Sequence, residues 1–188
     1  MIFNELLVKR RAVRNFEDQA VPMELVKTLI NDSIKAPNAG NSQAWRFIIV
    51  NNREMIRRMS DAGKAAILAD IESDPNSPMK RYEKPLRNDR FNVFYNAPCL
   101  VCIVGMTDDP NIAMDCALAG SYLMLSATAN GLATCWVALG AEIRDPALLN
   151  ELGMPEGYRI YAPIVVGYPK AIPDMPERKE PDIIRIIS

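Results

Sequence analysis

Residues 36–47 read APNAGNSQAWRF and lead from a polar, turn-rich loop directly into the apolar run FIIV at residues 47–50. Asn, Gly and Ser tolerate turn conformations, and Pro37 disfavours helical backbone in the residue before it, so the stretch predicts the join between a helix and a strand. A plain connecting loop does not by itself require Asn41 and Gln43 just before Trp45. The loop is therefore a candidate binding site as well as a turn.

Apolar spacing on both sides of this loop predicts alternating helices and strands. The preceding helix begins at Val21–Pro22, with Pro at its first position and Glu24 in its first turn, where both are favoured. Strands separated by helices indicate an α+β fold in α/β layers, with a mixed β-sheet flanked by helices. The predicted helices cover residues 2–9, 21–36, 54–72, 82–95, 110–129 and 145–152, the predicted strands cover 46–50, 99–105, 132–139 and 158–166, and an exposed loop covers 73–78.

Length and composition predict one folded domain, residues 1–188, with residues 168–188 as an extended C-terminal tail. Apolar residues make up 49% and charged residues 24%, a balance typical of folded proteins and not of disordered ones. The formal net charge of −1 predicts no attraction to nucleic acid or to an anionic membrane. No apolar run approaches the ~20 residues that cross a bilayer, and charged residues interrupt the N-terminus where a signal peptide would be apolar. We therefore expect a cytoplasmic location.

The four cysteines and the lack of histidine limit the chemistry that side chains can supply. Cys99 and Cys102 lie three positions apart in a predicted strand, so their side chains point to opposite faces and do not form one ligand sphere. Cys116 and Cys135 lie in apolar segments, where a thiol behaves as a small apolar residue. We expect no metal site. Because histidine is the commonest general acid or base, we infer that a cofactor carries the chemistry.

Residues 10–14, RRAVR, place three guanidinium groups within five positions near the N-terminus. Taken alone, this cluster is typical of a solvated helix end, where cations offset the negative end of the helix dipole. The alternative is an anion site, because charged hydrogen bonds to phosphate contribute ~1.5–3 kcal/mol each. These residues by themselves leave both interpretations open.

Together, the RRAVR cluster and the 36–47 loop resemble the flavin-dependent nitroreductase family. Members of that family hold FMN with an early basic cluster and a Pro-Ser-x-x-Asn-x-Gln-Pro-Trp loop. Here the loop reads PNAGNSQAW at residues 37–45, so Asn38 and Ala44 replace the family's Ser and second Pro. Ala12 stands where the family usually has Ser, which removes one hydroxyl contact. The resemblance covers nearly the whole chain.

The resemblance implies an FMN site built from several separate segments. The Arg cluster would reach the phosphate, the ribityl chain or the polar edge of the ring, and backbone N–H groups at residues 138–140 would lie beside the reactive edge of the isoalloxazine. A tail arginine would close over the phosphate, with Lys179 as its alternative, and a lysine on the helix after the first strand would lie near the ring. The 37–41 loop would come from the neighbouring subunit, with Gln43 and Trp45 bracing it. The implied cofactor-binding residues are Arg10, Arg11, Ala12, Arg14, Pro37, Asn38, Ala39, Asn41, Lys64, Ala138, Leu139, Gly140 and Arg178.

The same resemblance implies an NAD(P)H-dependent oxidoreductase that passes hydride through flavin N5 to nitro compounds, quinones or a related acceptor. Two alternatives stay open. One is a specialised flavin enzyme, such as a reductive dehalogenase or a flavin-fragmenting member, and the other is a protein that senses or stores flavin without catalysis. No Gly-x-Gly-x-x-Gly follows a predicted strand, so we do not expect a tightly held dinucleotide on a Rossmann domain.

Two apolar segments predict a homodimer. The helix over residues 110–129 is apolar on more faces than one small sheet can cover. The chain ends in IIRII at residues 183–187, which would be an aggregation hazard if it were exposed. This segment must be covered by its own core or by a second chain, and the resemblance implies that the tail is exchanged between subunits.

Overall fold

A four-stranded sheet forms the centre of the computed structural model, which describes residues 2–74 and 76–187. Its strands are β1 (Arg46–Val50), β2 (Cys99–Met106), β3 (Ala133–Trp136) and β4 (Tyr158–Gly167), in the spatial order β1-β2-β4-β3. All three neighbouring pairs of strands are antiparallel. The sheet is therefore antiparallel and not mixed as expected; the only parallel pairing among the described residues is an isolated bridge between Ala12 and Thr134, outside the four strands.

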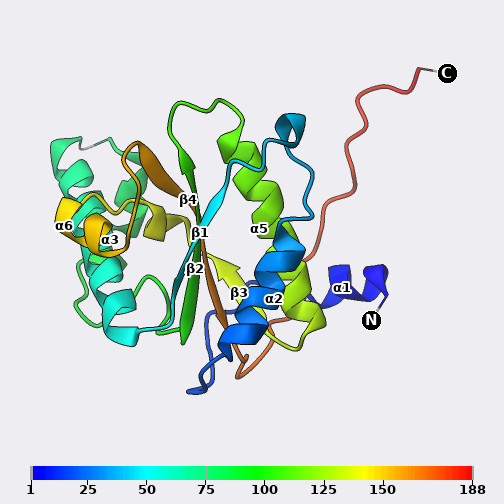
Figure 1. The fold of residues 1–188 in the computed structure, drawn as a ribbon, viewed down its shortest axis with the longest axis horizontal. Helices are drawn as coiled ribbons and strands as arrows, with labels where there is room; N and C mark the ends of the chain where they lie inside the picture. Colours follow the sequence, from blue (N-terminus) through cyan, green and yellow to red (C-terminus); the bar gives the residue numbers. More distant parts are fainter. Residues whose placement is uncertain (1, 75, 188) are drawn as a thin grey trace.

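Helices cover both faces of the sheet, as Figure 1 shows. One face carries α3 (Arg53–Ser73), α4 (Glu83–Leu86) and α6 (Pro146–Glu151), with the 3-10 turns η2 (Pro78–Tyr82) and η3 (Ala138–Ala141). The opposite face carries α2 (Met23–Ser33) and α5 (Ile112–Ala129), and α1 (Phe3–Lys9) packs against α5. The turn η1 (Ala39–Asn41) lies in the loop between α2 and β1. These elements form a layered α+β fold.

The central strand β2 divides the interior into two apolar clusters. From Cys99 to Val104 its side chains are buried on both faces, and successive residues belong to alternate clusters. Cys99 packs with the α2/α5 cluster and Cys102 with the α3 cluster, which confirms that the two thiols point to opposite faces. All four cysteines are free thiols in buried positions.

Most predicted elements are confirmed to within one or two residues, but three are not. The helix expected over residues 21–36 ends at Ser33, because the chain turns there, with the N–H of Ala36 donating to the carbonyl oxygen of Ser33 at 3.1 Å. Residues 82–95 were expected to be helical, and only α4 is, because Asx turns follow it: Asn88 Oδ1 accepts the N–H of Arg90 at 3.0 Å, and Asn92 Oδ1 accepts that of Phe94 at 2.8 Å. The strand expected over residues 132–139 ends at Trp136, because the chain turns there into η3. Met1, Ser188 and Pro75 of the predicted 73–78 loop lie outside the described residues.

By length and composition alone, α5 is apolar enough to cross a membrane, with a mean hydropathy of 1.3. In the structure, 44% of this segment is buried inside the fold, where it contacts α2 and strands β2, β3 and β4. A core helix has the same composition, and these contacts account for the buried part of α5, whereas Met114, Leu118 and Tyr122 stay exposed. The expectation that the protein has no membrane partner stays a prediction.

Candidate functional site

The segment Arg10–Arg14 is fixed to the edge of the sheet at β3. Arg10 ends α1, and the chain then becomes extended, with Ala12 bridging Thr134. The N–H of Val13 donates to the carbonyl oxygen of Thr134 at 3.0 Å, and the Val13 side chain is buried in the core. Because side chains alternate along extended backbone, burial of Val13 leaves Arg14 exposed on the other side.

The three guanidinium groups of this segment have no carboxylate partner among residues 2–74 and 76–187. Arg11 donates to the carbonyl oxygen of Arg10, and the Arg14 guanidinium carbon lies 5.7 Å from the centre of the Tyr95 ring. Hydrogen bonding to Tyr95, and then the neighbouring Cys135, raise the pKa of Arg14. The cluster is therefore a concentration of positive charge that the fold does not neutralise.

The turn η3 brings backbone N–H groups to the end of β3. Val137 still pairs with the sheet, donating to the carbonyl oxygen of Pro163 at 2.8 Å, before the chain turns. The N–H groups of Ala138 and Leu139 open the turn and so have no acceptor within it. Gly140 packs so closely on the Phe94 ring that a Cβ atom would lie 2.2 Å from it, which requires glycine at this position.

Sequence reasoning missed the segment Phe91–Asn96 as part of this region. Tyr95 and Asn96 both adopt left-handed backbone, with φ of 55° and 53°. Tyr95 lies under Arg14, and its ring meets Phe91 edge-on at 6.4 Å. The signal that could have found this turn is the series of turn-forming residues Asn88, Asn92 and Asn96 before Pro98.

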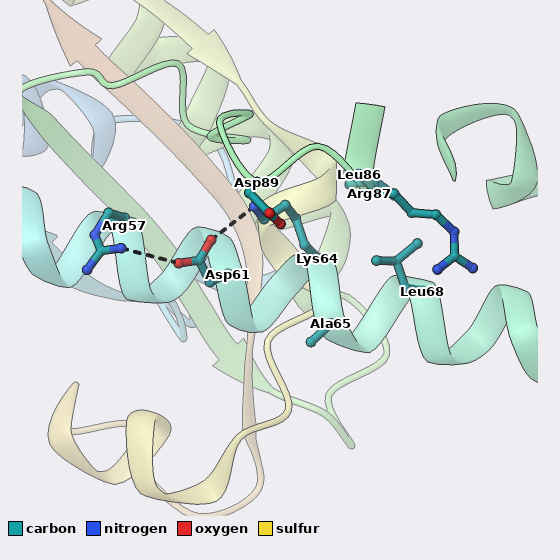
Figure 2. Close-up of a pocket in the computed structure, with 8 residues that line it drawn as sticks. All are labelled: Arg57, Asp61, Lys64, Ala65, Leu68, Leu86, Arg87 and Asp89. Atoms are coloured by element: carbon teal, nitrogen blue, oxygen red, sulfur yellow. Dashed lines mark ion pairs between the residues drawn. The ribbon is translucent and has the colours of Figure 1, made fainter. Parts of the chain in front are cut away.

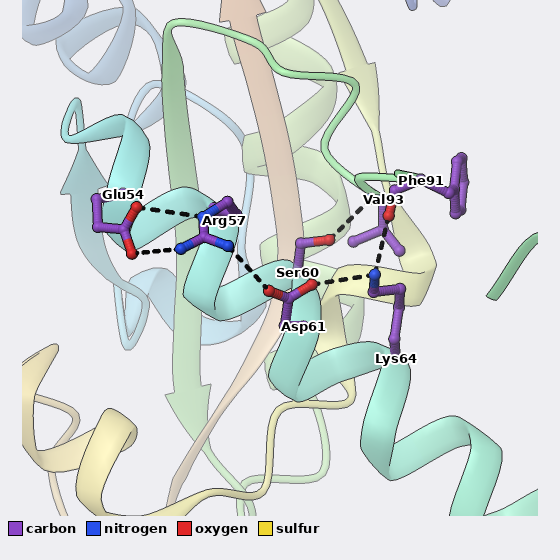
Figure 3. A network of polar contacts seen from close by, with 7 residues as sticks. All are labelled: Glu54, Arg57, Ser60, Asp61, Lys64, Phe91 and Val93. Atoms are coloured by element: carbon purple, nitrogen blue, oxygen red, sulfur yellow. Dashed lines mark hydrogen bonds and ion pairs between the residues drawn. The ribbon is translucent and has the colours of Figure 1, made fainter. Parts of the chain in front are cut away.

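Lys64 takes part in a polar network on α3, shown in Figure 3. Its side chain is only 9% exposed, and Nζ lies 3.0 Å from both the carbonyl oxygen of Phe91 and a carboxylate oxygen of Asp61. One turn earlier, the hydroxyl of Ser60 accepts the N–H of Val93 at 3.0 Å. Lys64 is thus held against the Phe91–Asn96 segment, with its charge balanced by Asp61. A contact between Lys64 and a flavin ring stays a prediction.

A cavity of about 640 Å³ opens on the outer side of this network, between α3 and the segment after α4 (Figure 2). Its lining does not include any residue of Arg10–Arg14 or of η3. The cations that line it already have acceptors: Arg57 and Lys64 pair with Asp61, and Arg87 pairs with Glu72 and Glu83. A phosphate would have to displace one of these carboxylates, so the charges do not favour this cavity as its site.

The loop at residues 37–43 is a compact structure held by its own polar groups and by α5. Asn38 Oδ1 accepts the N–H of Gln43 at 2.9 Å, so the Asn in place of the family's Ser braces the loop. The buried carboxylate of Asp115 accepts the N–H of Ala39, at 3.1 and 3.3 Å from its two oxygens. Asn41 and Gln43 have left-handed φ values of 55° and 48°, which only firm anchoring maintains in residues other than glycine. Trp45 is buried in the α2/α5 cluster and anchors the end of the loop.

Within one chain, this loop and the Arg cluster lie at opposite ends of α5. Asp115, which holds the loop, is in the first turn of α5, whereas Arg11 and Val13 line a small cavity with Thr128 in its last turn. The two turns are about 20 Å apart at a rise of ~1.5 Å per residue. Arg178 lies in an exposed tail without regular secondary structure (Figure 1). The fold therefore brings together the Arg cluster, η3 and the segment beside Lys64, but places the loop and Arg178 elsewhere.

The model of the Nitroreductase family matches residues 7–168. The chain belongs to the nitroreductase family. Its resemblance to that family, first apparent in the RRAVR cluster and the 36–47 loop, is thereby confirmed.

Relatives cover this nitroreductase-family chain along nearly its whole length. A protein from Archaeoglobus fulgidus with a provisional NADH dehydrogenase/NAD(P)H nitroreductase name is 28% identical over an alignment of 192 positions, which covers 96% of this chain and 94% of the relative. Iodotyrosine deiodinase 1 of Mus musculus is 26% identical over 207 residues, covering 98% of this chain and 68% of that protein. The crystal structure of an FMN-bound nitroreductase from Bacteroides fragilis is similar with a TM-score of 0.84, 24% identity and 98% coverage of both chains, which shows the shared fold.

Proposed function

We propose that the protein is an FMN-dependent oxidoreductase that takes electrons from NAD(P)H and passes them to a small acceptor such as a nitro compound or a quinone. The observation that carries this proposal is the unneutralised charge of Arg10, Arg11 and Arg14 beside η3, within the described part of the chain. Membership of the nitroreductase family and the FMN-bound B. fragilis relative support it.

The groups near the end of β3 are chemically complementary to the phosphate and the ring system of FMN. The guanidinium groups match a terminal phosphate, because charge-assisted hydrogen bonds between them are short and strong. The N–H groups that open η3 match negative charge on the ring system, because preorganised donors stabilise charge without reorganising. When bound, FMN supplies the electron-pair chemistry of the reaction.

The four cysteines are buried thiols and are poor nucleophiles. Burial raises the pKa of Cys99, Cys102 and Cys116 to about 12, so these thiols stay protonated near neutral pH. Burial also raises the pKa of Cys135, although Arg14 and Arg10 act in the opposite direction. The role of the protein is therefore to bind and orient the cofactor and its substrates.

A homodimer, proposed here as the active species, would complete the site. The 37–43 loop and Arg178 lie apart from the Arg cluster of their own chain, so a second chain is needed to bring all of these groups to one cofactor. A two-fold symmetric pair would then carry two equivalent sites at one self-complementary interface.

Exposed apolar surfaces support this assembly. Met114, Leu118 and Tyr122 project from one side of α5 at helical spacing, and Met114 is 60% exposed. Phe3 and Leu7 of the neighbouring α1 are also exposed, as are Ile183 and Ile184 in the tail, the latter at 97%. The tail is therefore not covered by its own core, which leaves a second chain as the way to bury it. An interface that joins these surfaces should bury more than ~2,000 Å².

Pigment analysis tests the central claim. The purified protein should be yellow, and the extracted pigment should be FMN and not FAD, because the cluster suits a single terminal phosphate. NADH or NADPH added without oxygen should bleach the bound flavin, and a screen of nitroaromatics, quinones and iodotyrosine would then identify the acceptor. A colourless protein that takes up no FMN on titration would defeat the proposal. Bound FMN that neither nucleotide reduces would favour the storage or sensing alternative.

Ultracentrifugation tests the assembly. Deleting residues 182–188 should weaken dimerisation and flavin retention together, and Arg178→Ala should weaken flavin retention while leaving the dimer intact. A wild-type monomer that keeps FMN at nanomolar protein concentration would rule out the shared site.

A further inference from the structure

The turn at Tyr95 and Asn96, beside the Arg cluster and η3, has strained backbone. Both residues are in the left-handed region, and neither is glycine. Two consecutive residues in this conformation are costly, and such strain persists only where surrounding contacts impose it. Strained turns of this kind concentrate at binding and catalytic sites.

Contacts from α3 and η3 fix the turn in place. On the α3 side, the Lys64 ammonium binds the carbonyl oxygen of Phe91 at 3.0 Å and the Ser60 hydroxyl accepts the N–H of Val93 at 3.0 Å (Figure 3). On the η3 side, the fully buried Phe94 ring packs against Gly140. These anchors give the chain little freedom to relax, and Tyr95 follows directly after Phe94.

The group presented is the half-buried Tyr95 ring, and it faces Arg14. The Arg14 guanidinium carbon is 5.7 Å from the ring centre, within the range of a cation–π contact. We infer that Tyr95 is a positioning residue that orients the Arg14 guanidinium for the bound cofactor's anionic or electron-rich groups, an inference that rests on the proposed FMN-dependent function.

A neutral ring suits this task better than a carboxylate would. An exposed arginine has many rotamers, and fixing it on binding costs conformational entropy. A carboxylate partner would restrict the side chain but would also cancel its charge, as happens to Arg57 beside Glu54 and Asp61. Tyr95 restricts Arg14 while leaving the positive charge available to a ligand.

The test is a double-mutant cycle on FMN affinity that combines Tyr95→Asn with Arg14→Ala. Asn tolerates left-handed backbone, so Tyr95→Asn removes the ring without adding strain. It should weaken FMN binding about five- to tenfold and alter the visible spectrum of the bound flavin, and Tyr95→Phe should recover part of the loss. On the Arg14→Ala background the Tyr95 change should have almost no further effect, because Tyr95 acts through Arg14.

Asn96→Gly is the matched control, because it relaxes the same turn and keeps the ring. It should leave FMN affinity and the flavin spectrum unchanged. Additive losses in the cycle, or wild-type affinity in Tyr95→Asn, would overturn the inference. If Tyr95→Asn fails to fold, the same cycle run with Tyr95→Gly, which also removes the ring and accepts left-handed backbone, decides by the same criterion. Wild-type protein that binds no FMN would instead overturn the proposed function, so the two failures are distinguishable.

Discussion

The charged surface of α3 and the Arg10–Arg14 segment are both rich in arginine, but only one of them neutralises its charge. On α3, Arg57 binds Glu54 and Asp61, and Arg58 forms hydrogen bonds of 2.7 and 2.8 Å with Glu151. No such partner meets the three arginines of the N-terminal segment among the described residues.

The difference teaches where a phosphate can bind. On α3 a phosphate must first displace a carboxylate that already binds the arginine. The free energy of phosphate binding is then only the difference between two similar charged interactions. At Arg10–Arg14 a bound phosphate displaces no carboxylate among the described residues: Arg11 donates to a backbone carbonyl oxygen and Arg14 lies over the Tyr95 ring. The number of arginines does not tell which region can bind a phosphate. The presence or absence of carboxylate partners does.

The largest expected effect is the loss of FMN binding when the unneutralised charges are removed. Arg10→Ala and Arg14→Ala should each weaken binding by about 1–3 kcal/mol, since each removes a charged hydrogen bond. Affinity can be measured by quenching of FMN fluorescence at one fixed salt concentration. Arg57→Ala on α3 is the matched control and should leave FMN affinity unchanged. Equal losses in all three variants would mean that the two regions do not differ.

A smaller effect is expected from Asp115, which acts on the 37–43 loop. Its carboxylate is 3% exposed and accepts the N–H of Ala39, so Asp115→Ala removes the loop's anchor on α5. We expect FMN affinity to fall about tenfold, a loss of about 1.4 kcal/mol, with a smaller loss in Asp115→Asn, whose amide oxygen can accept the same N–H. Thermal unfolding separates loop loosening from global instability. Wild-type affinity in a folded Asp115→Ala protein would show that the loop does not contact the cofactor.

Lys64 should behave as a member of the neutralised region. Lys64→Met leaves the Phe91 carbonyl oxygen without its donor and should lower the free energy of unfolding by about 1–3 kcal/mol. Its effect on FMN affinity should be smaller than that of Arg14→Ala, because Asp61 balances the lysine charge. Urea unfolding and FMN titration of the same variant give both numbers. If FMN affinity falls as far as in Arg14→Ala while stability holds, Lys64 contacts the flavin ring.

The elements that the sequence predicts well are those whose own pattern determines them. The run at Cys99–Met106 is apolar in consecutive positions, which is typical of a strand covered on both faces, and it is β2. Strand β1 begins and ends where predicted, between a turn-rich loop and Asn51. In these segments the apolar pattern and the turn residues at each end predict the same strand.

Segments shaped by distant contacts were predicted less well. The turn at Tyr95 depends on Ser60, Lys64 and Gly140, which lie far away in the sequence. The Arg cluster is visible from its spacing, but the lack of carboxylate partners follows only from where the fold places each acid. The position of the 37–43 loop at the far end of α5 depends likewise on tertiary packing.

The smallest expected effect concerns Arg144, which binds Asp70 of α3 through two hydrogen bonds of 2.7 Å. The bond from Arg144 lowers the pKa of Asp70, so the pair contributes stability at a pH above the ordinary carboxyl value of ~3.9 and loses it as the pH falls through the lowered one. Arg144→Ala should return the pKa of Asp70 to its ordinary value in an NMR titration. Because both partners are exposed, stability near neutral pH should fall only slightly, and wild-type and variant should converge in acid. FMN affinity should not change, since this charge is already cancelled. A fall in affinity comparable to that of Arg14→Ala would show that cancelled and uncancelled arginines serve the cofactor alike.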